Sequence, residues 1–478
     1  MDAKTETKTL QHFIGGDWLD AEDGETITSF NPIDDSIYCY AAKGTGNDIR
    51  KAIAAARATF PAYKKTTAKE RERMLLRVAE IMEEREDEII NCLIDEIGSP
   101  LGKAQFEFAK GLTLVRAAAG MVRNVRGETF PSDTPGKFSM SIREPVGVVA
   151  IITPFNVPLI KTTRLVANAL ALGNTVVHLP SEMAPHITIL MAEIIRDAGF
   201  PAGAYNVVTG NGVEIGDDLT SSKDIDFLTF TGSSAVGQHV HEICARNKTK
   251  NTLELGGKSP NIIFADASID QAVEGIVSGI WFNQGQVCCA GSRVFVEESV
   301  LPDVVDRLRA RMDTLRVGDP LDKNTDVGAI NSPEQLATIQ RYLDVGAAEG
   351  AEAHVAAGDP LPDRGYWCRP TFFTGVEPAH TIAREEIFGP VLAVMSFRTP
   401  DEAIRRANDT PYGLSAGIWT DKGSKMFAVA RKLKAGVVWC NTFNRFDPTA
   451  PFGGFKESGF GREGGMQGLR PYVRFSGR

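Results

Sequence analysis

The sequence lacks the marks of a disulfide-rich, membrane-spanning or secreted protein. Its seven cysteines are an odd number and lie scattered, apart from the adjacent Cys288 and Cys289, and no CxxC spacing occurs. This usage indicates no disulfide framework and favours a reducing, cytoplasmic compartment. The N-terminus is polar and contains acids, unlike a secretory signal, and no apolar run approaches the roughly 18 residues of a membrane span.

Basic surfaces and metal-ligand clusters are also missing. The net charge of −9 and the pI near 5.5 argue against a nucleic-acid-binding protein, which needs a basic face. His239 and His241 are close in sequence, but residues two apart on a helix face different directions. We therefore expect no metal. The chain also has no repeat of solenoid period and no low-complexity segment, which excludes repeat arrays.

The composition that remains is typical of a soluble globular protein. With 478 residues, 43% hydrophobic and 24% charged, the chain is long enough for two or three domains. Residues 1–50 predict an arm with short strands. Apolar residues recur at helical spacing in three segments, which predict amphipathic helices packed on one core: residues 48–60, 67–98 and 102–125.

Residues 129–143 interrupt this helical region. Pro131, Pro135 and Gly136 break the segment, and residues 138–142 alternate in polarity as a strand does. Residues 471–476 alternate in the same way. Because isolated strands need a sheet to belong to, we expect a protruding hairpin together with a tail strand.

From Val146 onward, strand and helix patterns alternate. The apolar run of residues 146–152 is typical of a strand buried on both faces of a parallel sheet. This series continues with strands at 175–178, 205–208 and 226–230 and helices at 159–172 and 187–197. A second series follows Gly257, at residues 261–264, 269–282, 293–296, 300–315, 387–392 and 436–441. Such alternation predicts doubly wound parallel sheets, which bind ligands at the carboxyl ends of their strands.

Two glycine-rich turns follow strands of the first series. Residues 210–216 have one residue too many for the G-x-G-x-x-G pattern, and residues 232–237 lack both the Gly-Lys of a P-loop and the glycine pair of a dinucleotide fingerprint. Either turn alone is a weak signal, and an ordinary helix start stays open. A helix N-terminus is nevertheless a suitable site for an anion.

The segment Asn283–Gly291 places Cys288 on a glycine-flanked turn between a helix and a strand. A thiol in such a place can be activated as a nucleophile, and nearby backbone N–H groups can stabilise an oxyanion. Upstream, Glu254 ends a strand pattern just before Gly256 and Gly257, where a carboxylate can act as a general base. The alternatives are a buried structural cysteine and a solvated glutamate in a turn.

Together and in this order, the two motifs resemble those of the aldehyde dehydrogenase superfamily. Its glutamate motif reads like residues 253–260, and its nucleophile motif, Gly-Gln-x-Cys, matches residues 285–288. The similarity covers nearly the whole chain, with further matches at residues 153–158, 386–390 and 451–459.

The resemblance implies an α/β fold with two doubly wound parallel-sheet domains and a small β-hairpin oligomerisation flap. It assigns residues 1–125 and 146–255 to an NAD-binding domain and residues 256–465 to a catalytic domain. Residues 126–145 and 466–478 would form the flap of a homodimer or homotetramer.

The implied reaction is the oxidation of an aldehyde through a covalent intermediate. Cys288 attacks the aldehyde, while the Asn156 amide and the Cys288 N–H stabilise the oxyanion. Hydride transfer to the nicotinamide then leaves a thioester, and Glu254 activates water to release the acid. The presence of Glu254 disfavours a relative that acylates coenzyme A. The presence of all three residues disfavours a non-catalytic, crystallin-like binding protein.

The resemblance also implies an NAD site. Its residues would be Ile152, Thr153, Pro154, Phe155, Glu182, Gly212, Gly232, Ser233, Leu255, Glu386 and Phe388. One position departs from the family pattern, because Leu179 stands where a lysine is common. Glu182 would accept hydrogen bonds from the ribose hydroxyls and repel a 2′-phosphate, and the missing cation removes a phosphate partner, so NAD is favoured over NADP.

The substrate pocket follows from the same resemblance. Its residues would be Val157, Lys161, Arg164, Trp281, Phe282, Val287, Cys289, Asn444, Arg445, Phe446 and Phe452. The small Val157, the aromatic side chains and the similarity of residues 153–160 to benzaldehyde-, vanillin- and salicylaldehyde-type enzymes favour an aromatic aldehyde. Lys161 and Arg164 lie one turn apart and could instead meet a substrate carboxylate, as in semialdehyde dehydrogenases, or face solvent or a domain interface.

Overall fold

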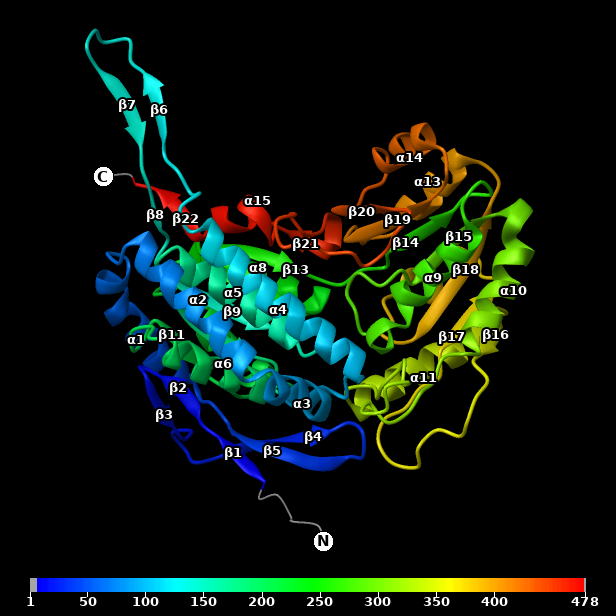
Figure 1. Ribbon diagram of the computed structural model, residues 1–478, viewed down its shortest axis with the longest axis horizontal. Helices are drawn as coiled ribbons and strands as arrows, with labels where there is room; N and C mark the ends of the chain where they lie inside the picture. Colours follow the sequence, from blue (N-terminus) through cyan, green and yellow to red (C-terminus); the bar gives the residue numbers. More distant parts are fainter. Residues whose placement is uncertain (1–6, 477–478) are drawn as a thin grey trace.

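The computed structural model describes residues 7–476. The predicted arm contains a three-stranded sheet of order β1-β5-β4, formed by β1 (Lys8–Leu10), β4 (Thr26–Asn31) and β5 (Ser36–Ala42). This sheet lies at the lower edge of the molecule in Figure 1. Residues 1–6, which we assigned to the NAD-binding domain, and residues 477–478, which we assigned to the flap, lie outside the described residues.

Four helices follow the arm: α1 (Gly46–Tyr63), α2 (Ala68–Glu84), α3 (Glu86–Ile97) and α4 (Leu101–Met121). Thr45 and Thr67 begin α1 and α2 with capping boxes, in which the threonine side chain accepts a backbone N–H three residues on. The single helix predicted over 67–98 is wrong. Arg85 leaves the helical conformation, with φ −112°, and pairs with Glu88 and Glu193, so that a second helix starts there.

The first doubly wound sheet is confirmed. Its strand order is β21-β13-β12-β9-β10-β11-β2-β3. Five strands run parallel: β9 (Val148–Thr153), β10 (Thr175–Pro180), β11 (Tyr205–Val207), β12 (Phe227–Thr231) and β13 (Lys250–Glu254). The antiparallel edges are β2 (His12–Ile14), β3 (Asp17–Leu19) and β21 (Gly459–Phe460). The connecting helices are α5 (Pro158–Ala171), α6 (Pro185–Asp197), α7 (Gly212–Thr220) and α8 (Ser234–Asn247).

The second sheet has the order β16-β17-β18-β15-β14-β19-β20. Its predicted members are β14 (Pro260–Ile263), β15 (Arg293–Glu297), β18 (Val391–Phe397) and β20 (Val437–Cys440), with β18 several residues later than expected. The prediction missed β16 (Glu352–Val355), β17 (Thr371–Thr374) and β19 (Ser415–Trp419). The helices around it are α9 (Ile269–Ile280), α10 (Leu301–Met312), α11 (Pro333–Ala348), α12 (Thr381–Arg384), α13 (Pro400–Asn408) and α14 (Gly423–Ala430).

A hairpin of β6 (Glu128–Pro131) and β7 (Phe138–Ser141) projects from the body (Figure 1). At its base, β8 (Arg143–Pro145) pairs with the tail strand β22 (Val473–Phe475), which follows α15 (Gly465–Leu469). The hairpin leaves large apolar side chains exposed, at Phe130, Phe138 and Met140. The expected hairpin and tail strand are therefore both present.

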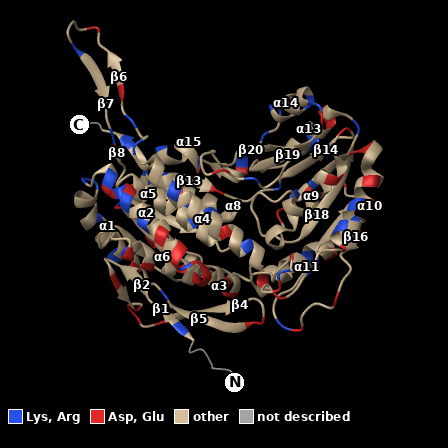
Figure 2. Cartoon of the chain, viewed as in Figure 1, with Lys and Arg blue, Asp and Glu red and all other residues tan. Residues whose placement is uncertain are grey.

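Charged residues of both signs are interspersed along the outer helices (Figure 2). Among the described residues, no helix is long and apolar enough to cross a membrane.

Candidate active site

Cys288 lies on a tight turn between α9 and β15. The chain leaves α9 through the short 3-10 turn Phe282–Gly285, in which Asn283 (φ 52°) and Gln284 (φ 57°) have left-handed conformations. Gly285 follows with φ 73°, and a Cβ there would lie 2.0 Å from the Gly389 carbonyl oxygen, so only glycine fits. This turn directs the next residues toward the neighbouring sheet.

The two adjacent thiols differ in acidity. A hydrogen bond from Cys289 outweighs burial and, together with the Lys161 ammonium, lowers the pKa of the half-buried Cys288 thiol to about 7. The pKa of Cys289 is raised well above its usual value because the same hydrogen bond and burial favour its neutral form. Asn444 Oδ1, 3.5 Å from the Cys289 sulfur, is an alternative acceptor for the same thiol hydrogen. Cys288 is therefore the better nucleophile of the pair.

The glutamate motif and the cysteine motif meet through two glycines. A Cβ on Gly257 would lie 2.4 Å from the Cys288 carbonyl oxygen, and one on Gly256 would lie 2.1 Å from Glu386 Oε2. The Gly257 N–H donates to Glu386 Oε1 at 3.0 Å. Glu386 is half-buried, and burial raises the pKa of its carboxyl to about 7.

Glu254 ends β13 and is only 3% exposed. Within the described chain, neither of its carboxylate oxygens has a hydrogen-bond partner. Burial, reinforced by the negative charge of Glu463, raises the pKa of Glu254 well above its usual value. Gly453 gives this carboxyl its room, because a Cβ at that position would lie 2.7 Å from Glu254 Oε1.

Lys161 and Arg164 are both paired with one buried carboxylate. Lys161 Nζ lies 2.8 Å and Arg164 Nη1 3.2 Å from the same oxygen of Glu463, Oε2, and all three residues are buried. The two cations lower the pKa of Glu463 despite its burial. Glu463 had no recognisable signal in the sequence, since it stands about 300 residues after its partners.

Asn156 lies in the loop between β9 and α5 and is 5% exposed. Its Nδ2 donates to the Gln286 carbonyl at 2.9 Å, which places the amide beside the turn that carries Cys288. Its own backbone carbonyl accepts bonds from Lys103 Nζ and Asn283 Nδ2, both at 3.1 Å. The second hydrogen of the Asn156 amide is left for another acceptor.

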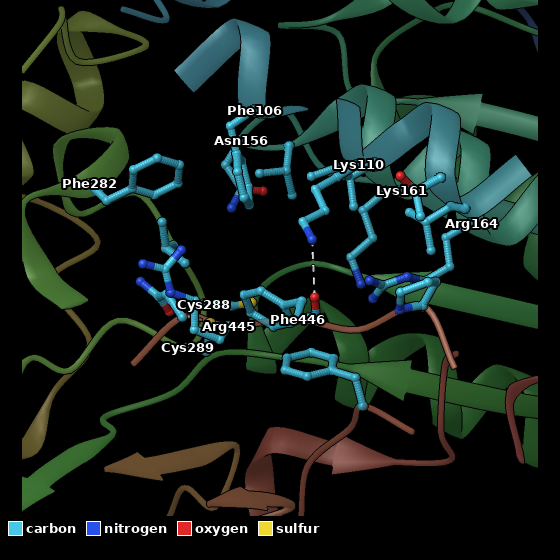
Figure 3. A pocket seen from close by; sticks show the side chains of 18 of the residues that line it. Phe106, Lys110, Asn156, Lys161, Arg164, Phe282, Cys288, Cys289, Arg445 and Phe446 are labelled. Carbon is cyan, nitrogen blue, oxygen red and sulfur yellow. Dashed lines mark hydrogen bonds between the residues drawn. The ribbon is translucent and has the colours of Figure 1, made fainter. Parts of the chain in front are cut away.

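One cavity of about 200 Å³ brings Cys288, Asn156, Lys161 and Arg164 together (Figure 3). Cys288 and Asn156 line it with ten of the expected pocket residues: Val157, Lys161, Arg164, Phe282, Val287, Cys289, Asn444, Arg445, Phe446 and Phe452. Sequence reasoning missed Phe106, Lys110, Thr113, Leu114, Ile160, Ser278, Phe443 and Pro448. We call the part beside the buried Lys161 and Arg164 the inner end, and the part beside the half-buried Lys110 and the exposed Arg445 the mouth.

Trp281 is a correction to the expected pocket. Its side chain is 1% exposed and its indole Nε1 donates to the Pro390 carbonyl at 3.2 Å. It is not among the residues that line the cavity. The ring is directed into the core of the second domain-like half because it follows α9 before the chain turns.

The carboxyl edge of the first sheet can accommodate a dinucleotide. Glu182 follows β10, and its Oε2 lies 4.0 Å from where a Cβ on Gly212, the first residue of α7, would stand. Ser233 caps α8 by accepting the Val236 N–H. Two apolar side chains there, Val213 (91%) and Val236 (47%), are exposed to solvent in the first turns of α7 and α8. The acid suits the hydroxyls of a ribose, and the helix N-termini with the adjacent glycine suit a pyrophosphate. The exposed apolar surface suits an adenine.

Most of the remaining expected cofactor residues lie at or near the same carboxyl edge of the first sheet. Ile152 and Thr153 end β9, Pro154 and Phe155 follow them, and Gly232 follows β12. Phe388, with φ 55°, packs its ring edge-on against Phe155 with centroids 6.0 Å apart. Leu255 is buried against Gly237 of α8.

Leu179 is 1% exposed and packs in the core with Val148 and Val177. Where the family commonly has a lysine, this chain therefore has a buried apolar residue that stabilises β10.

Two histidines of the first half, His12 and His178, are fully buried. Burial lowers the pKa of His12 to about 4 and that of His178 to about 3, which keeps both neutral. In the part of the chain that the structure describes, no group of three or more His, Cys, Asp or Glu is placed to hold a metal ion.

Known proteins resemble this chain over almost its full length. A family model described as "Aldehyde dehydrogenase family" matches residues 18–476. The mitochondrial benzaldehyde dehydrogenase of Antirrhinum majus is 39% identical over 96% of this chain and 87% of that protein. The crystal structure of an NAD-dependent aldehyde dehydrogenase from Sinorhizobium meliloti superposes with a TM-score of 0.97, at 37% identity, over 100% of this chain and 96% of that one. The NAD+ complex of an aldehyde dehydrogenase from Bacillus cereus has a TM-score of 0.95, at 37% identity, over 98% and 96% of the two chains.

Proposed function

Within the aldehyde dehydrogenase family, to which this chain belongs, we propose that Cys288 attacks an aromatic aldehyde and that the carboxylic acid is the product. The chain is an oxidoreductase that acts on aldehydes, with NAD as cofactor. The observation that carries the proposal is a thiol with a pKa lowered to about 7 in a cavity with aromatic walls. The Asn156 amide lies beside that thiol.

The first step is addition of the Cys288 thiolate to the aldehyde carbon, which gives a thiohemiacetal. The developing oxyanion lies within reach of the free hydrogen of the Asn156 amide and of the Cys288 N–H. Asn156 is preorganised for this task, because Lys103 and Asn283 hold its backbone and Gln286 holds its side chain. Such preorganised donors cost no reorganisation when the charge forms.

Bound NAD+ supplies the hydride acceptor that converts the thiohemiacetal into a thioester. On the protein side, Glu182 and the N-termini of α7 and α8 would hold the adenosine half, and Glu386 and Phe388 the nicotinamide half. Glu182 favours NAD over NADP because its carboxylate repels a 2′-phosphate.

Glu254 then serves as the base for hydrolysis. Its carboxylate oxygens have no partner among the described residues and can accept a proton from water. A raised pKa makes this carboxyl a stronger base than a solvated glutamate, closer to the optimum for proton transfer near neutral pH. Water adds to the thioester carbon, the C–S bond breaks, and the acid leaves with Cys288 restored. This base also disfavours coenzyme A as the acyl acceptor.

The aromatic assignment rests on the walls of the cavity. Five phenylalanines line it, and the small Val157 leaves space beside the nucleophile. The pairing of Lys161 and Arg164 with Glu463 weakens the competing reading, in which those two cations bind the carboxylate of an aliphatic semialdehyde. The resemblance to a plant benzaldehyde dehydrogenase supports the same choice.

We also propose that the two sheets correspond to an NAD-binding domain (1–125 and 146–255) and a catalytic domain (256–465). The hairpin and tail strand (126–145 and 466–478) would mediate a homodimer or homotetramer in the cytoplasm. The exposed Phe130, Phe138 and Met140 support this role, because large exposed apolar side chains mark interaction surfaces.

The test is NADH formation by the wild-type protein with benzaldehyde, a hydroxylated benzaldehyde, succinate semialdehyde and a medium-length aliphatic aldehyde. We expect the highest kcat/KM with the aromatic members. A clear preference for succinate semialdehyde or for the aliphatic aldehyde would overturn the aromatic assignment. Absence of NADH formation with every aldehyde would overturn the proposed reaction.

A further inference from the structure

The cavity carries an excess of positive charge. Four of its lining residues are cationic, Lys110, Lys161, Arg164 and Arg445, and none of the lining residues is an Asp or Glu. Glu463, which lies behind the wall, offsets only the inner pair. A site for uncharged aldehydes alone has no need of cations at its mouth.

The two cations of the mouth come from distant segments and line the same cavity. Lys110 lies on α4, and its Nζ donates to the Phe446 carbonyl at 3.1 Å, as the dashed line in Figure 3 shows. Arg445 is the residue before Phe446. One hydrogen bond to a neutral carbonyl leaves the Lys110 ammonium with two donors and its full charge.

Arg445 is held in place by its neighbours rather than by its own side chain. Asn444 has a left-handed backbone (φ 53°) and donates to the Ser278 carbonyl at 2.8 Å, and its Oδ1 lies 3.5 Å from the Cys289 sulfur. The Trp439 indole donates to the Arg445 carbonyl at 2.8 Å. Among the described residues, the Arg445 guanidinium has no ion pair or hydrogen bond, so an anion entering the mouth would be its first strong partner.

The carboxylate nearest in sequence acts on Lys110 from outside the cavity: hydrogen bonds from Thr449 and, after them, the charge of Lys110 lower the pKa of Asp447. Asp447 is exposed, accepts the Thr449 N–H at 2.8 Å, and is not among the residues that line the cavity. The inner cations differ, since they share one buried carboxylate oxygen.

We propose that the physiological substrate is an aromatic aldehyde with an anionic group on its ring, attracted by the positive charges of Lys110 and Arg445 that line the cavity while the aldehyde carbon meets Cys288. This rests on the proposed aromatic function and adds the substrate's charge and the residues that read it. The phenylalanines hold the ring and the mouth holds the anion. Arg445 can contact a carboxylate through two N–H groups, and Lys110 acts as a point charge.

The experiment compares four probes on the full-length protein: para-formylbenzoate, its neutral methyl ester, benzaldehyde and succinate semialdehyde. We expect the wild type to have a KM for para-formylbenzoate about tenfold below that for the ester. The variants Arg445→Gln and Lys110→Met should each reduce the ratio of kcat/KM for the acid to that for the ester about tenfold. Arg445→Lys, which keeps the charge, should restore part of the ratio.

A matched control is Lys223→Gln, which removes an exposed cation from a loop far along the chain from the cavity residues. The ratio of the acid to the ester is read within each variant, so a partial loss of folded enzyme cancels. Equal KM values for acid and ester, or ratios unchanged in both mouth variants, would overturn the inference while leaving benzaldehyde oxidation intact. If only succinate semialdehyde is oxidised, the aromatic function itself fails.

Discussion

The inner end and the mouth of the cavity each carry two cations, but in different electrical settings. Lys161 and Arg164 are buried and share one oxygen of Glu463, whereas Lys110 and Arg445 are partly or fully exposed and face no lining carboxylate. A buried charge must be paired to be tolerated, while a hydrated one can stay unpaired until a ligand arrives. The inner pair is thus suited to tune neighbouring groups, and the outer pair to select a substrate.

The strongest test of the inner end is Cys288→Ser. A hydroxyl has a far higher pKa than a thiol, so the inner cation cannot keep it ionised near neutral pH, and we expect NADH formation to fall by about a thousandfold or more. Cys440→Ser, a half-buried thiol outside the cavity, is the control for removal of a sulfur atom. Substantial activity in the Cys288 variant would exclude this thiol as the nucleophile.

Glu254→Gln should have the next largest effect. Removal of a general base typically costs about 10²–10⁴-fold, here in hydrolysis of the thioester. Acylation does not use this base, so a stoichiometric burst of NADH should precede the slow steady state. Rapid-mixing absorbance measurements would show it. A steady-state rate equal to that of the wild type would contradict the role of Glu254.

Glu463→Gln should leave both Lys161 and Arg164 buried without their shared carboxylate partner. Removing one partner of a buried ion pair typically destabilises a protein by about 3–5 kcal/mol, so the midpoint of thermal unfolding should fall. The pKa of Glu254 should also fall, because the negative charge of Glu463 helps to raise it. Glu457→Gln, an exposed acid nearby in sequence, is the matched control. Unchanged stability and pH dependence would show that the ion pairs contribute little.

The dependence of thiol reactivity on pH should reveal the inner charge directly. The pKa of Cys288 is lowered to about 7, so its alkylation rate should rise about tenfold per pH unit below that value and level off above it. Lys161→Met should move this rise to higher pH, because the ammonium favours the thiolate. Alkylation by iodoacetamide, with labelled peptides quantified separately, measures each cysteine. If Lys161→Met does not shift the pH dependence of alkylation, the Lys161 charge does not lower the pKa of Cys288.

A higher salt concentration should weaken anion binding at the mouth more than the ion pairs of the inner end, and this is the smallest effect that we expect. Exposed charges are screened within about 8 Å at physiological ionic strength, and buried pairs much less. Raising the salt concentration about tenfold should increase KM for para-formylbenzoate roughly two- to threefold. The thermal midpoint, to which the inner pair contributes, should change little by comparison. Equal salt responses for the acid and its methyl ester would argue against an anion site at the mouth.

Much of the fold could be read from the order of residues. The run of residues 146–152 is apolar at every position, and strand β9 is buried there on both faces because parallel strands lie between two layers of helices. The glycines around Glu254 and Cys288 also predicted tight turns at the site. A Cβ on Gly256, Gly257 or Gly285 would clash with a neighbouring segment. Local patterns succeed where one residue's own geometry decides the outcome.

Other elements left little trace in the sequence. The edge strand β16 (Glu352–Val355) is only four residues long and mostly exposed, and β19 (Ser415–Trp419) begins with small residues that predict no particular structure. Both are strands because their neighbours offer backbone groups to pair with. At the break between α2 and α3, Arg85 pairs with Glu193, about a hundred residues away.

By itself, the sequence determined the α/β class, the family resemblance and the residues suited to nucleophilic attack and general base catalysis. Only the tertiary structure decided which charges are free. In the sequence, Lys161 and Arg164 could meet a substrate carboxylate or face solvent or a domain interface, and the fold places Glu463 at 2.8 and 3.2 Å from them. Trp281 was expected in the pocket wall, but its indole donates to the Pro390 carbonyl. The physical reason is that the energy of a charge depends on its burial and its partners, and chain order specifies neither of these.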